Sequence, residues 1–367
     1  MNLTNKFRSL AVILLSCFIA FLAVEYLYRL IKSVNTSDSY SMRSMLFESG
    51  NNFLNYDGYI KYFPNISIQS MTVYSKREPK NIEDLVIEYN YIISTNNEGL
   101  VMQNDIYYND RVLFVIGDSF TEGQGASPWF YIFEDNYDKT LRKPVNLGIL
   151  GTGPMQWLNL AKSVVQQKNL KVDGIVINII PADMTRKVWN LNEAELECLH
   201  NTNCNYNYGF QGFQFSDKNN YENIKKTVLN NINRIKDIKT IPQEFSYVQL
   251  IKDYARNSAV IYDLYTMFFL DHNQIFKQNE DALISLKDLT NEKFFVNVLT
   301  EKELDSSNYN NYPNANRLIN FLMHNDIDFA WCNIPKNGFH KIDGHPNYKG
   351  YEIVRECTEN AVKSIHM

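Results

Sequence analysis

Short apolar runs alternate with helical apolar patterns over much of the chain from residue 112 onward. The runs at 112–116, 174–180 and 329–332 are typical of strands, and a weaker run lies at 145–147. The first run is apolar throughout, as expected of a strand that is covered on both faces.

Apolar residues recur at helical spacing in the segments between these runs. One such segment begins at Pro154, a residue that suits the first position of a helix, and others lie at 318–323 and 354–365. Strands that alternate with helices predict a parallel sheet with helices on both faces. We therefore expect an α/β fold.

The N-terminus contains the longest apolar stretch of the chain, within residues 1–32. It has roughly the 20 residues that a spanning helix needs, which predicts a single membrane anchor. Lys6 and Arg8 precede the stretch and favour a cytoplasmic N-terminus, although Arg29 and Lys32 on the far side reduce the charge asymmetry. A cleaved signal peptide is the alternative, but no clear small-x-small cleavage site follows.

Composition divides the rest of the chain into a linker, a lead-in and an insertion. Residues 33–46 are polar and predict a juxtamembrane linker, whereas residues 47–367 form one domain. Within it, 47–110 is a Tyr- and Asn-rich lead-in with short strands, and about 189–306 is an insertion that breaks the strand–helix alternation. The most periodic part of this insertion, 247–269, predicts a helix.

Charge and cysteine content exclude some function classes. The net charge is −5 and the Lys and Arg residues are scattered, so we expect no nucleic-acid partner. The five cysteines show no CxxC pair that would indicate zinc. Only Cys198 and Cys204 are close in sequence, and they are either a small disulfide loop or two free thiols.

Candidate chemistry begins at the end of the first predicted strand, where the sequence reads Gly117-Asp118-Ser119. In an open α/β sheet, ligands bind beyond the carboxyl ends of the strands, so Ser119 stands where a nucleophile would act. An ordinary strand-ending turn is the alternative, because turns are rich in these residues.

A second candidate lies near the C-terminus, in Asp343-Gly344-His345. Residues two apart in an extended segment project to the same side, so Asp343 can orient one ring nitrogen of His345 while the other faces a hydroxyl. A serine hydroxyl needs such a base to become a nucleophile. An ordinary loop histidine, or a metal site made of His340, Asp343 and His345, is the alternative, but neither explains the serine motif.

Three sequence blocks together resemble the SGNH (GDSL-type) serine hydrolases. They are Gly117-Asp118-Ser119, the stretch 146–151 and Asp343-Gly-His345-Pro, and the resemblance covers roughly 112–183 and 329–367. It implies a flavodoxin-like three-layer α/β/α sandwich, acyl-ester chemistry, and no metal or organic cofactor. The N-terminal anchor is similar to that of a membrane-bound bacterial branch associated with surface polysaccharides.

The resemblance also implies a role for each matching residue. Ser119 is the expected nucleophile, His345 the base, and Asp343 the group that orients the base. The backbone N–H groups of Ser119 and Gly151 are the expected donors to the oxyanion.

One block departs from the family's pattern. The third block is usually Gly-x-Asn-Asp, whose Asn side chain completes the oxyanion hole, but Ala182 occupies the Asn position here. A missing oxyanion donor costs about 10²- to 10³-fold in rate. Asn178 is a poor substitute because it lies within a predicted strand, and Thr185, Arg186 or a group from the insertion remain as candidates.

The sequence thus predicts a membrane-anchored serine esterase with its catalytic domain outside the cytoplasm. Its expected substrate is an acylated carbohydrate, with O-acetyl the simplest acyl group, or a small ester. An O-acetyltransferase is one alternative, since the same triad can pass the acyl group to a sugar hydroxyl. A non-catalytic glycan-binding protein on the same fold is another, because Ala182 replaces the expected donor.

Overall fold

The computed structural model describes most of the chain from residue 42 onward. The described ranges are 42–188, 220–240 and 272–365, with short gaps at 49–51, 77–78, 127, 138–141, 291–292 and 305, and a few single residues before 42. Among these residues, no helix is both long and apolar enough to cross a membrane. Most of the expected anchor at 1–32, the pair Cys198 and Cys204, and the expected helix at 247–269 lie outside the described residues.

A five-stranded parallel sheet forms the centre of the fold, in the order β10-β9-β8-β6-β7. Its strands are β6 Arg111–Gly117, β7 Lys143–Asn146, β8 Lys171–Ile179, β9 Phe294–Leu299 and β10 Phe329–Cys332. This order, in which the chain reverses direction after the second strand, is the flavodoxin-like one. The four apolar runs read as strands in the sequence are confirmed, because each belongs to a strand of this sheet.

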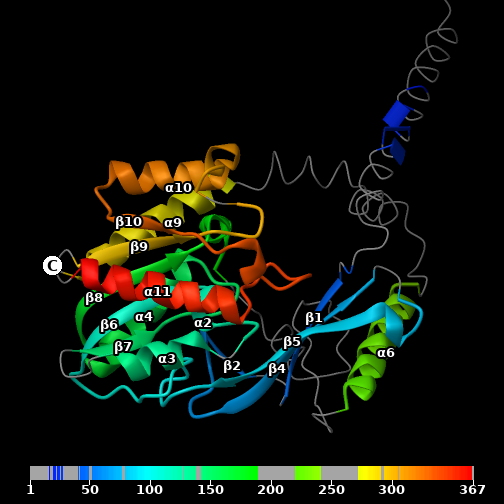
Figure 1. The fold of residues 1–367 in the computed structure, drawn as a ribbon, viewed down its shortest axis with the longest axis horizontal. Helices are drawn as coiled ribbons and strands as arrows, with labels where there is room; N and C mark the ends of the chain where they lie inside the picture. Colours follow the sequence, from blue (N-terminus) through cyan, green and yellow to red (C-terminus); the bar gives the residue numbers. More distant parts are fainter. Residues whose placement is uncertain are drawn as a thin grey trace, which may run out of the picture.

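Helices cover both faces of the sheet (Figure 1). They are α3 Trp129–Asn136, α4 Pro154–Lys168, α9 His272–Lys287, α10 Pro313–His324 and α11 Tyr348–Ser364. Helices α3 and α11 contact each other on one face, and α4 and α9 contact each other on the other. The expected α/β fold with a parallel sheet is therefore confirmed.

Two elements of the sandwich lie inside the segment that we expected to be an insertion, 189–306. Strand β9 pairs with β8 and β10 and is central to the sheet, and α9 packs against α4. The run Phe294–Leu299 was missed because a buried Asn297 interrupts it within an Asn-rich region. This expectation was wrong for residues 272–299.

A second, antiparallel sheet precedes the sandwich. It consists of β1 Met42–Phe47, β4 Ser67–Ser75 and β5 Leu85–Ser94. Between β1 and β4 in the sequence, β2 Phe53–Tyr56 and β3 Tyr59–Tyr62 form a separate two-stranded hairpin. Strand β1 begins within the expected linker 33–46, where Met45 and Leu46 are buried and bring this stretch into the fold.

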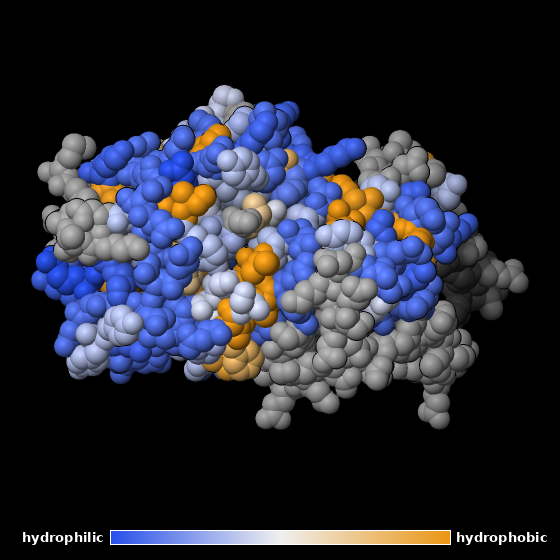
Figure 2. Space-filling model, turned by 60° about the horizontal axis from the view of Figure 1, so that its bottom comes forward, coloured by the Kyte–Doolittle hydropathy of each residue, from blue (hydrophilic) through white to orange (hydrophobic). Residues whose placement is uncertain are grey.

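The two faces of this N-terminal sheet have different partners. Leu46, Met71 and Val73 pack with Ile224 and Val228 of α6 (Tyr221–Thr240) in a separate apolar cluster. The opposite face joins the main core, because side chains alternate between faces along each strand. The face of the molecule seen in Figure 2 is largely hydrophilic, with small scattered apolar patches.

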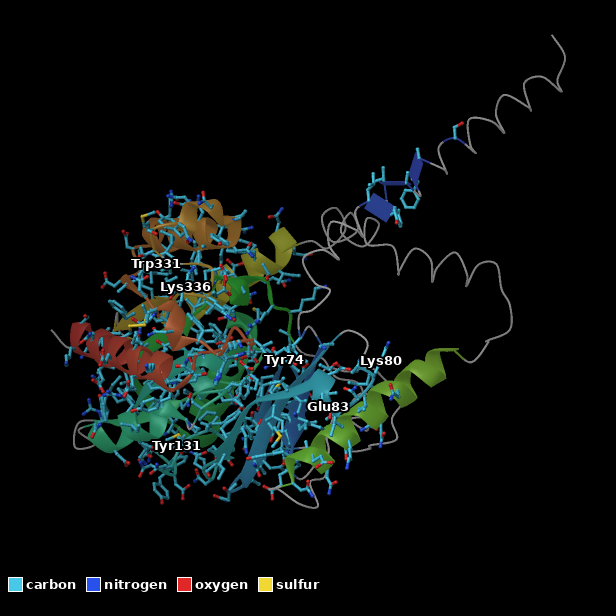
Figure 3. All side chains as sticks on the ribbon, turned by 45° about the vertical axis from the view of Figure 1, so that its right-hand side comes forward. Tyr74, Lys80, Glu83, Tyr131, Trp331 and Lys336 are labelled. Atoms are coloured by element: carbon cyan, nitrogen blue, oxygen red, sulfur yellow. A yellow bond between two sulfur atoms is a disulfide. The ribbon has the colours of Figure 1, made fainter. Side chains whose placement is uncertain are left out.

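The N-terminal sheet is also tied to the sandwich by hydrogen bonds. Tyr131 of α3 (Figure 3) uses its hydroxyl to donate to the Ser94 carbonyl at 2.7 Å and to accept from the Ser94 N–H at 2.8 Å. The end of β5 is thereby held against α3. This contact fixes the sheet beside the edge of the sandwich where the candidate site lies.

Candidate active site

Ser119 lies at the carboxyl end of β6, at the start of the short helix α2 (Ser119–Glu122). Asp118 caps this helix, because its Oδ1 accepts the Phe120 N–H at 2.9 Å. Gly117 is required by a close approach: a Cβ there would stand 2.0 Å from Thr121 Oγ1 and 2.4 Å from the Asn178 carbonyl oxygen. The strand-to-helix turn therefore holds the serine at the ligand-binding edge of the sheet.

The structure brings Ser119, His345 and Asp343 into one hydrogen-bonded chain. Ser119 Oγ lies 2.9 Å from His345 Nε2, and His345 Nδ1 lies 2.6 Å from Asp343 Oδ1. Asp343 and His345 lie in the loop before α11, as the Asp-x-His spacing predicted. With Nδ1–H donating to the carboxylate, Nε2 is the nitrogen that can accept the serine proton.

Ser119 Oγ has a second possible acceptor. Asp118 Oδ2 lies 3.1 Å from it, and this oxygen also accepts Arg186 Nη1 at 2.8 Å. The serine hydroxyl hydrogen can therefore point to Asp118 or to His345, and only the second arrangement hands it to a base.

The carboxylate of Asp343 is almost fully buried and is held by groups from the N-terminal sheet. Tyr89 of β5 donates its hydroxyl to Asp343 Oδ2 at 2.7 Å, and Arg43 Nε of β1 lies 3.6 Å from the same oxygen. Burial alone would raise the pKa of Asp343, but the hydrogen bond and charge of His345, with Arg43, hold it well below its usual range. The site therefore favours the ionised form of Asp343, which is the form that can accept the His345 proton.

Tyr89 is the centre of this supporting network. Its oxygen accepts hydrogen bonds from Gln124 Nε2 at 2.6 Å and from Arg43 Nη2 at 3.1 Å while it donates to Asp343. No sequence pattern indicates these residues, because Tyr89 and Asp343 are 254 positions apart and no motif joins them. The lead-in is thus part of the site.

The second expected oxyanion donor, Gly151, lies in the loop between β7 and α4. It has φ +68°, a left-handed conformation that suits glycine. Neither its N–H nor that of Ser119 has a hydrogen-bond partner among the described residues. Both groups are therefore available to a ligand.

The side chain of Glu122 bonds the loop that contains Gly151. It is fully buried, and its carboxylate accepts the Leu150 N–H at 2.6 Å and the Tyr62 hydroxyl at 3.0 Å. Burial raises the pKa of Glu122 to about 8, although both hydrogen bonds act in the opposite direction. Glu122 therefore links α2 to the peptide that precedes Gly151.

The candidates for the missing donor lie in different surroundings. Asn178 is buried in β8, where its side chain bonds Thr358 and Asn297. Thr185 Oγ1 donates to the carbonyl oxygen of Ala182 at 2.9 Å, within the short turn η2 (Pro181–Thr185). Arg186 follows this turn and reaches Asp118.

His340, which could form a metal site with Asp343 and His345 according to the sequence, is hydrogen-bonded to a backbone carbonyl. Its Nε2 lies 2.8 Å from the Gly125 carbonyl oxygen, and the ring packs against that of Tyr89 with centroids 4.7 Å apart. Burial lowers the pKa of His340. In the described part of the chain, no cluster of three or more His, Cys, Asp or Glu residues could hold a metal ion.

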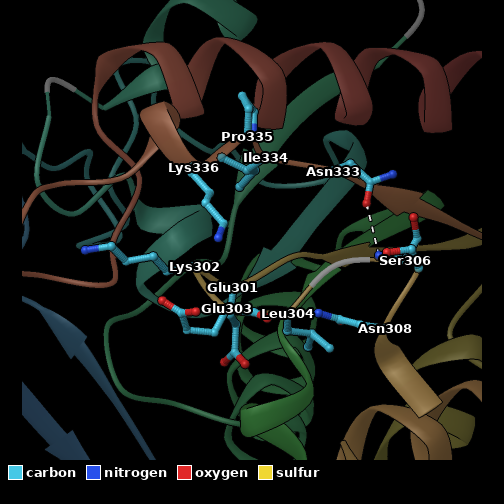
Figure 4. A pocket seen from close by; sticks show the side chains of 11 residues that line it. Glu301, Lys302, Glu303, Leu304, Ser306, Asn308, Asn333, Ile334, Pro335 and Lys336 are labelled. Carbon is cyan, nitrogen blue, oxygen red and sulfur yellow. Dashed lines mark hydrogen bonds between the residues drawn. The ribbon is translucent and has the colours of Figure 1, made fainter. Parts of the chain in front are cut away.

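A polar pocket of about 500 Å³ lies between the loops that follow β9 and β10 (Figure 4). Glu301, Lys302 and Lys336 are among the residues that line it, and Lys336 extends into the space between the loops. Lys302 Nζ also donates to the carbonyls of His340 and Lys341, at 3.2 and 2.7 Å. One wall of the pocket is thereby joined to the loop that carries Asp343.

A disulfide joins Cys332 at the end of β10 to Cys357 in α11. The sequence analysis did not pair these cysteines, because they are 25 residues apart and no spacing rule connects them. The loop that the disulfide closes contains both Asp343 and His345.

Several solved structures are similar to this chain at low identity. A GDSL-like lipase from Bacteroides thetaiotaomicron is 14% identical, with 70% of this chain and 88% of that one covered and a TM-score of 0.30. A carbohydrate acetylesterase family member from Sinorhizobium meliloti is 11% identical (70% and 98% covered, TM-score 0.34), and an acetylxylan esterase from Geobacillus stearothermophilus is also 11% identical (70% and 95%, 0.31). Neither a protein-family model nor a curated protein matches the chain. At these TM-scores, any function has to be argued from the site itself.

Proposed function

We propose that the protein is a serine esterase that removes O-acyl groups, with O-acetyl the simplest, from a cell-surface glycan. The observation that carries the proposal is the chain from Ser119 Oγ to His345 Nε2 and from His345 Nδ1 to Asp343, at 2.9 and 2.6 Å. A hydroxyl, a base and an orienting carboxylate at these distances are what nucleophilic acyl transfer requires.

The reaction follows from the geometry of these groups. Ser119 Oγ attacks the ester carbonyl carbon while its proton passes to His345 Nε2, and Asp343 stabilises the resulting imidazolium. The carbonyl oxygen becomes an oxyanion that accepts the N–H groups of Ser119 and Gly151. Collapse breaks the ester bond, the leaving alcohol takes the proton from His345, and an acyl-Ser119 remains. Water, deprotonated by His345, then releases the carboxylic acid and restores the serine.

The polar pocket beside β9 and β10 supports a sugar as the alcohol part of the ester. Its charged side chains can bond hydroxyl groups, and Lys302 connects it to the catalytic loop. The same pocket could hold a sugar acceptor, in which case the acyl-enzyme would be resolved by a sugar hydroxyl and the protein would be an O-acetyltransferase. Incubation with an acetyl donor and a glycan distinguishes the two, since release of acetate without acetylated glycan rules out transfer.

We also propose that residues 1–32 anchor the protein in the cell membrane with the catalytic domain outside the cytoplasm. The apolar N-terminal stretch supports the anchor. The Cys332–Cys357 disulfide supports an oxidising compartment, because such bonds seldom persist in the cytoplasm. Extraction of the full chain from membranes by detergent but not by carbonate, with protease sensitivity from the outer side only, is the expected result.

The activity is tested by labelling the purified full chain with an active-site serine phosphonate. We expect the wild type to be labelled and Ser119→Ala to lose labelling completely. Ser285→Ala is the matched control, because Ser285 is a helix residue whose hydroxyl bonds the Asp281 carbonyl. If the wild type is not labelled, or Ser119→Ala is labelled equally, the esterase proposal is wrong and a glycan-binding role becomes the better hypothesis.

A further inference from the structure

Position 182 leaves the expected oxyanion hole one donor short, and the structure removes two of the residues considered as replacements. The Asn178 amide is fully buried within β8, where it bonds Asn297 and Thr358. The Thr185 hydroxyl is used within its own turn, where it donates to the Ala182 carbonyl. Asn178 is therefore out of reach of a ligand, and the Thr185 hydroxyl has already used its single hydrogen.

Arg186, in contrast, lies where the three blocks of the site meet. Its Nη1 is 2.8 Å from Asp118 Oδ2, 3.0 Å from the Thr152 carbonyl oxygen and 2.8 Å from Asp183 Oδ1. Asp118 precedes the nucleophile and Thr152 follows Gly151. The guanidinium therefore contacts the residues next to Ser119 and Gly151, whose N–H groups are expected to face the oxyanion.

Two hydrogen bonds separate the guanidinium from the nucleophile. Asp118 Oδ2 accepts from Arg186 Nη1 and also lies 3.1 Å from Ser119 Oγ. A guanidinium carries five N–H donors in a rigid plane. The two hydrogens of Nη1 are used by Asp118 Oδ2 and the Thr152 carbonyl, whereas Asp183 Oδ1 forms an ion pair with Nη1 without a hydrogen bond. In the described part of the chain, Nε and Nη2 of Arg186 have no hydrogen-bond partner, so donors remain for a ligand.

We propose that Arg186 is a catalytic residue that donates the oxyanion hydrogen bond that an Asn at position 182 would otherwise supply. This inference rests on the proposed esterase function. Arg186 follows the end of η2, four residues after Ala182, whose methyl group packs against the main apolar core and offers no donor. The long Arg side chain thus reaches from a different position toward the same reacting oxygen.

The surroundings of Arg186 fix the direction of the guanidinium and keep it charged. Burial would lower its pKa, but Asp183 and Asp118 more than offset this and raise it. Asp118 alone offsets the single charge of the guanidinium, so Arg186 would stabilise an oxyanion mainly as a fixed N–H donor. Such preorganised donors lose little to reorganisation during the reaction.

The alternative is that Arg186 only holds Asp118, Thr152 and Asp183 together. The two roles differ in whether a donor restored at position 182 can compensate for the loss of Arg186. An Asn side chain at 182 cannot rejoin the three segments, but it can donate to the oxyanion.

The experiment compares Arg186→Met, Ala182→Asn and the double variant in the full chain, by the rate of phosphonate labelling and by kcat/KM for an aryl acetate. We expect Arg186→Met to lose about 10²- to 10³-fold in both rates, mostly in kcat, as removal of an oxyanion donor does. We expect the double variant to be at least about 10-fold faster than Arg186→Met, because an Asn at position 182 would restore part of the rate that one oxyanion donor contributes.

Two further variants separate catalysis from folding. Arg142→Met removes another buried arginine, one that bonds Tyr137 and the Asp173 carbonyl away from the site, and should lower thermal stability without a comparable loss of rate. Arg186→Lys keeps the charge but not the planar fork and should have an intermediate rate, which tests the inference even if Arg186→Met does not fold.

The outcomes distinguish this inference from the function on which it rests. An unlabelled wild type would overturn both. A labelled wild type, with Arg186→Met as fast as wild type or with a loss that Ala182→Asn does not reduce, would overturn the role of Arg186 and leave the esterase proposal standing.

Discussion

Replacement of Tyr89 by Phe tests whether the N-terminal sheet stabilises Asp343, the carboxylate of the candidate active site. The variant keeps the ring but removes the hydroxyl that donates to Asp343 Oδ2 at 2.7 Å and accepts from Gln124 and Arg43. A hydrogen bond to a charged group contributes about 1.5–3 kcal/mol, so we expect the free energy of unfolding at pH 7 to fall by about that amount. If the same interaction orients the base in the transition state, kcat/KM falls at most about 10- to 100-fold.

The dependence on pH follows from the direction of the Asp343 pKa. Because folding holds this pKa below its unfolded value of about 3.9, the stabilisation is complete above that pH and is lost as the pH falls toward the folded value. Wild type and Tyr89→Phe share the same unfolded pKa, so the difference in stability between them changes only near the folded pKa of Asp343, which lies well below the usual range. This difference should therefore be the same at pH 7 and at pH 4. Urea unfolding at both pH values, with activity on an aryl acetate at pH 7, measures it.

Tyr91→Phe is the matched control for this prediction. Tyr91 lies on the same strand and is equally buried, but its hydroxyl has no hydrogen-bond partner among the described residues. We expect Tyr91→Phe to keep its activity and its stability at both pH values, because it removes no hydrogen bond. If the two variants behave alike in both assays, the network around Asp343 does not stabilise this carboxylate.

Three further perturbations have expected outcomes. Glu122→Gln should raise the free energy of unfolding at pH 9 by at most about 4–5 kcal/mol and should not raise it at pH 4, because the stability linked to the raised pKa of Glu122, about 8, is full below the unfolded pKa and is lost as the pH rises through 8. If the stability of wild type and variant changes with pH in the same way across this range, the prediction is wrong. Replacing Cys332 and Cys357 together by Ser should lower the free energy of unfolding in urea by about 3–4 kcal/mol, because the disulfide closes a loop of moderate length. A loss below about 1 kcal/mol would be inconsistent with the bond. Gly148→Ala should slow phosphonate labelling and lower the melting temperature, because the new Cβ would stand 2.5 Å from the Glu122 backbone nitrogen. Gly344→Ala is the control and should keep its melting temperature, because no atom lies within 4 Å of its new Cβ; equal melting temperatures of the two variants would refute the close approach at Gly148.

Local patterns were sufficient for the framework of the sandwich. The run that became β6 is apolar at every position because both of its faces are covered, and Pro154 starts α4 where its missing N–H costs nothing. The Asp343-x-His345 spacing likewise placed both side chains on one side of a single segment. These features depend on neighbours in sequence and can be read from it.

Long-range partners could not be read in this way. Strand β9 was hidden because Asn297 interrupts its apolar run, and only the pairing with Asn178 across the sheet explains why an amide is buried there. The Cys332–Cys357 pair also follows from how α11 packs beside β10.

The sequence alone therefore determined which residues carry the candidate chemistry and which edge of the sheet presents them, since these depend on short motifs at the ends of strands. Only the tertiary structure decided what surrounds them. Tyr89 and Arg43 contact Asp343, and Glu122 bonds the loop that contains Gly151. Arg186 bonds Asp118, whereas the side chains of Asn178 and Thr185 bond other groups. These contacts join segments far apart in the chain, and burial, which the sequence pattern does not specify residue by residue, sets their strength and the pKa values that result.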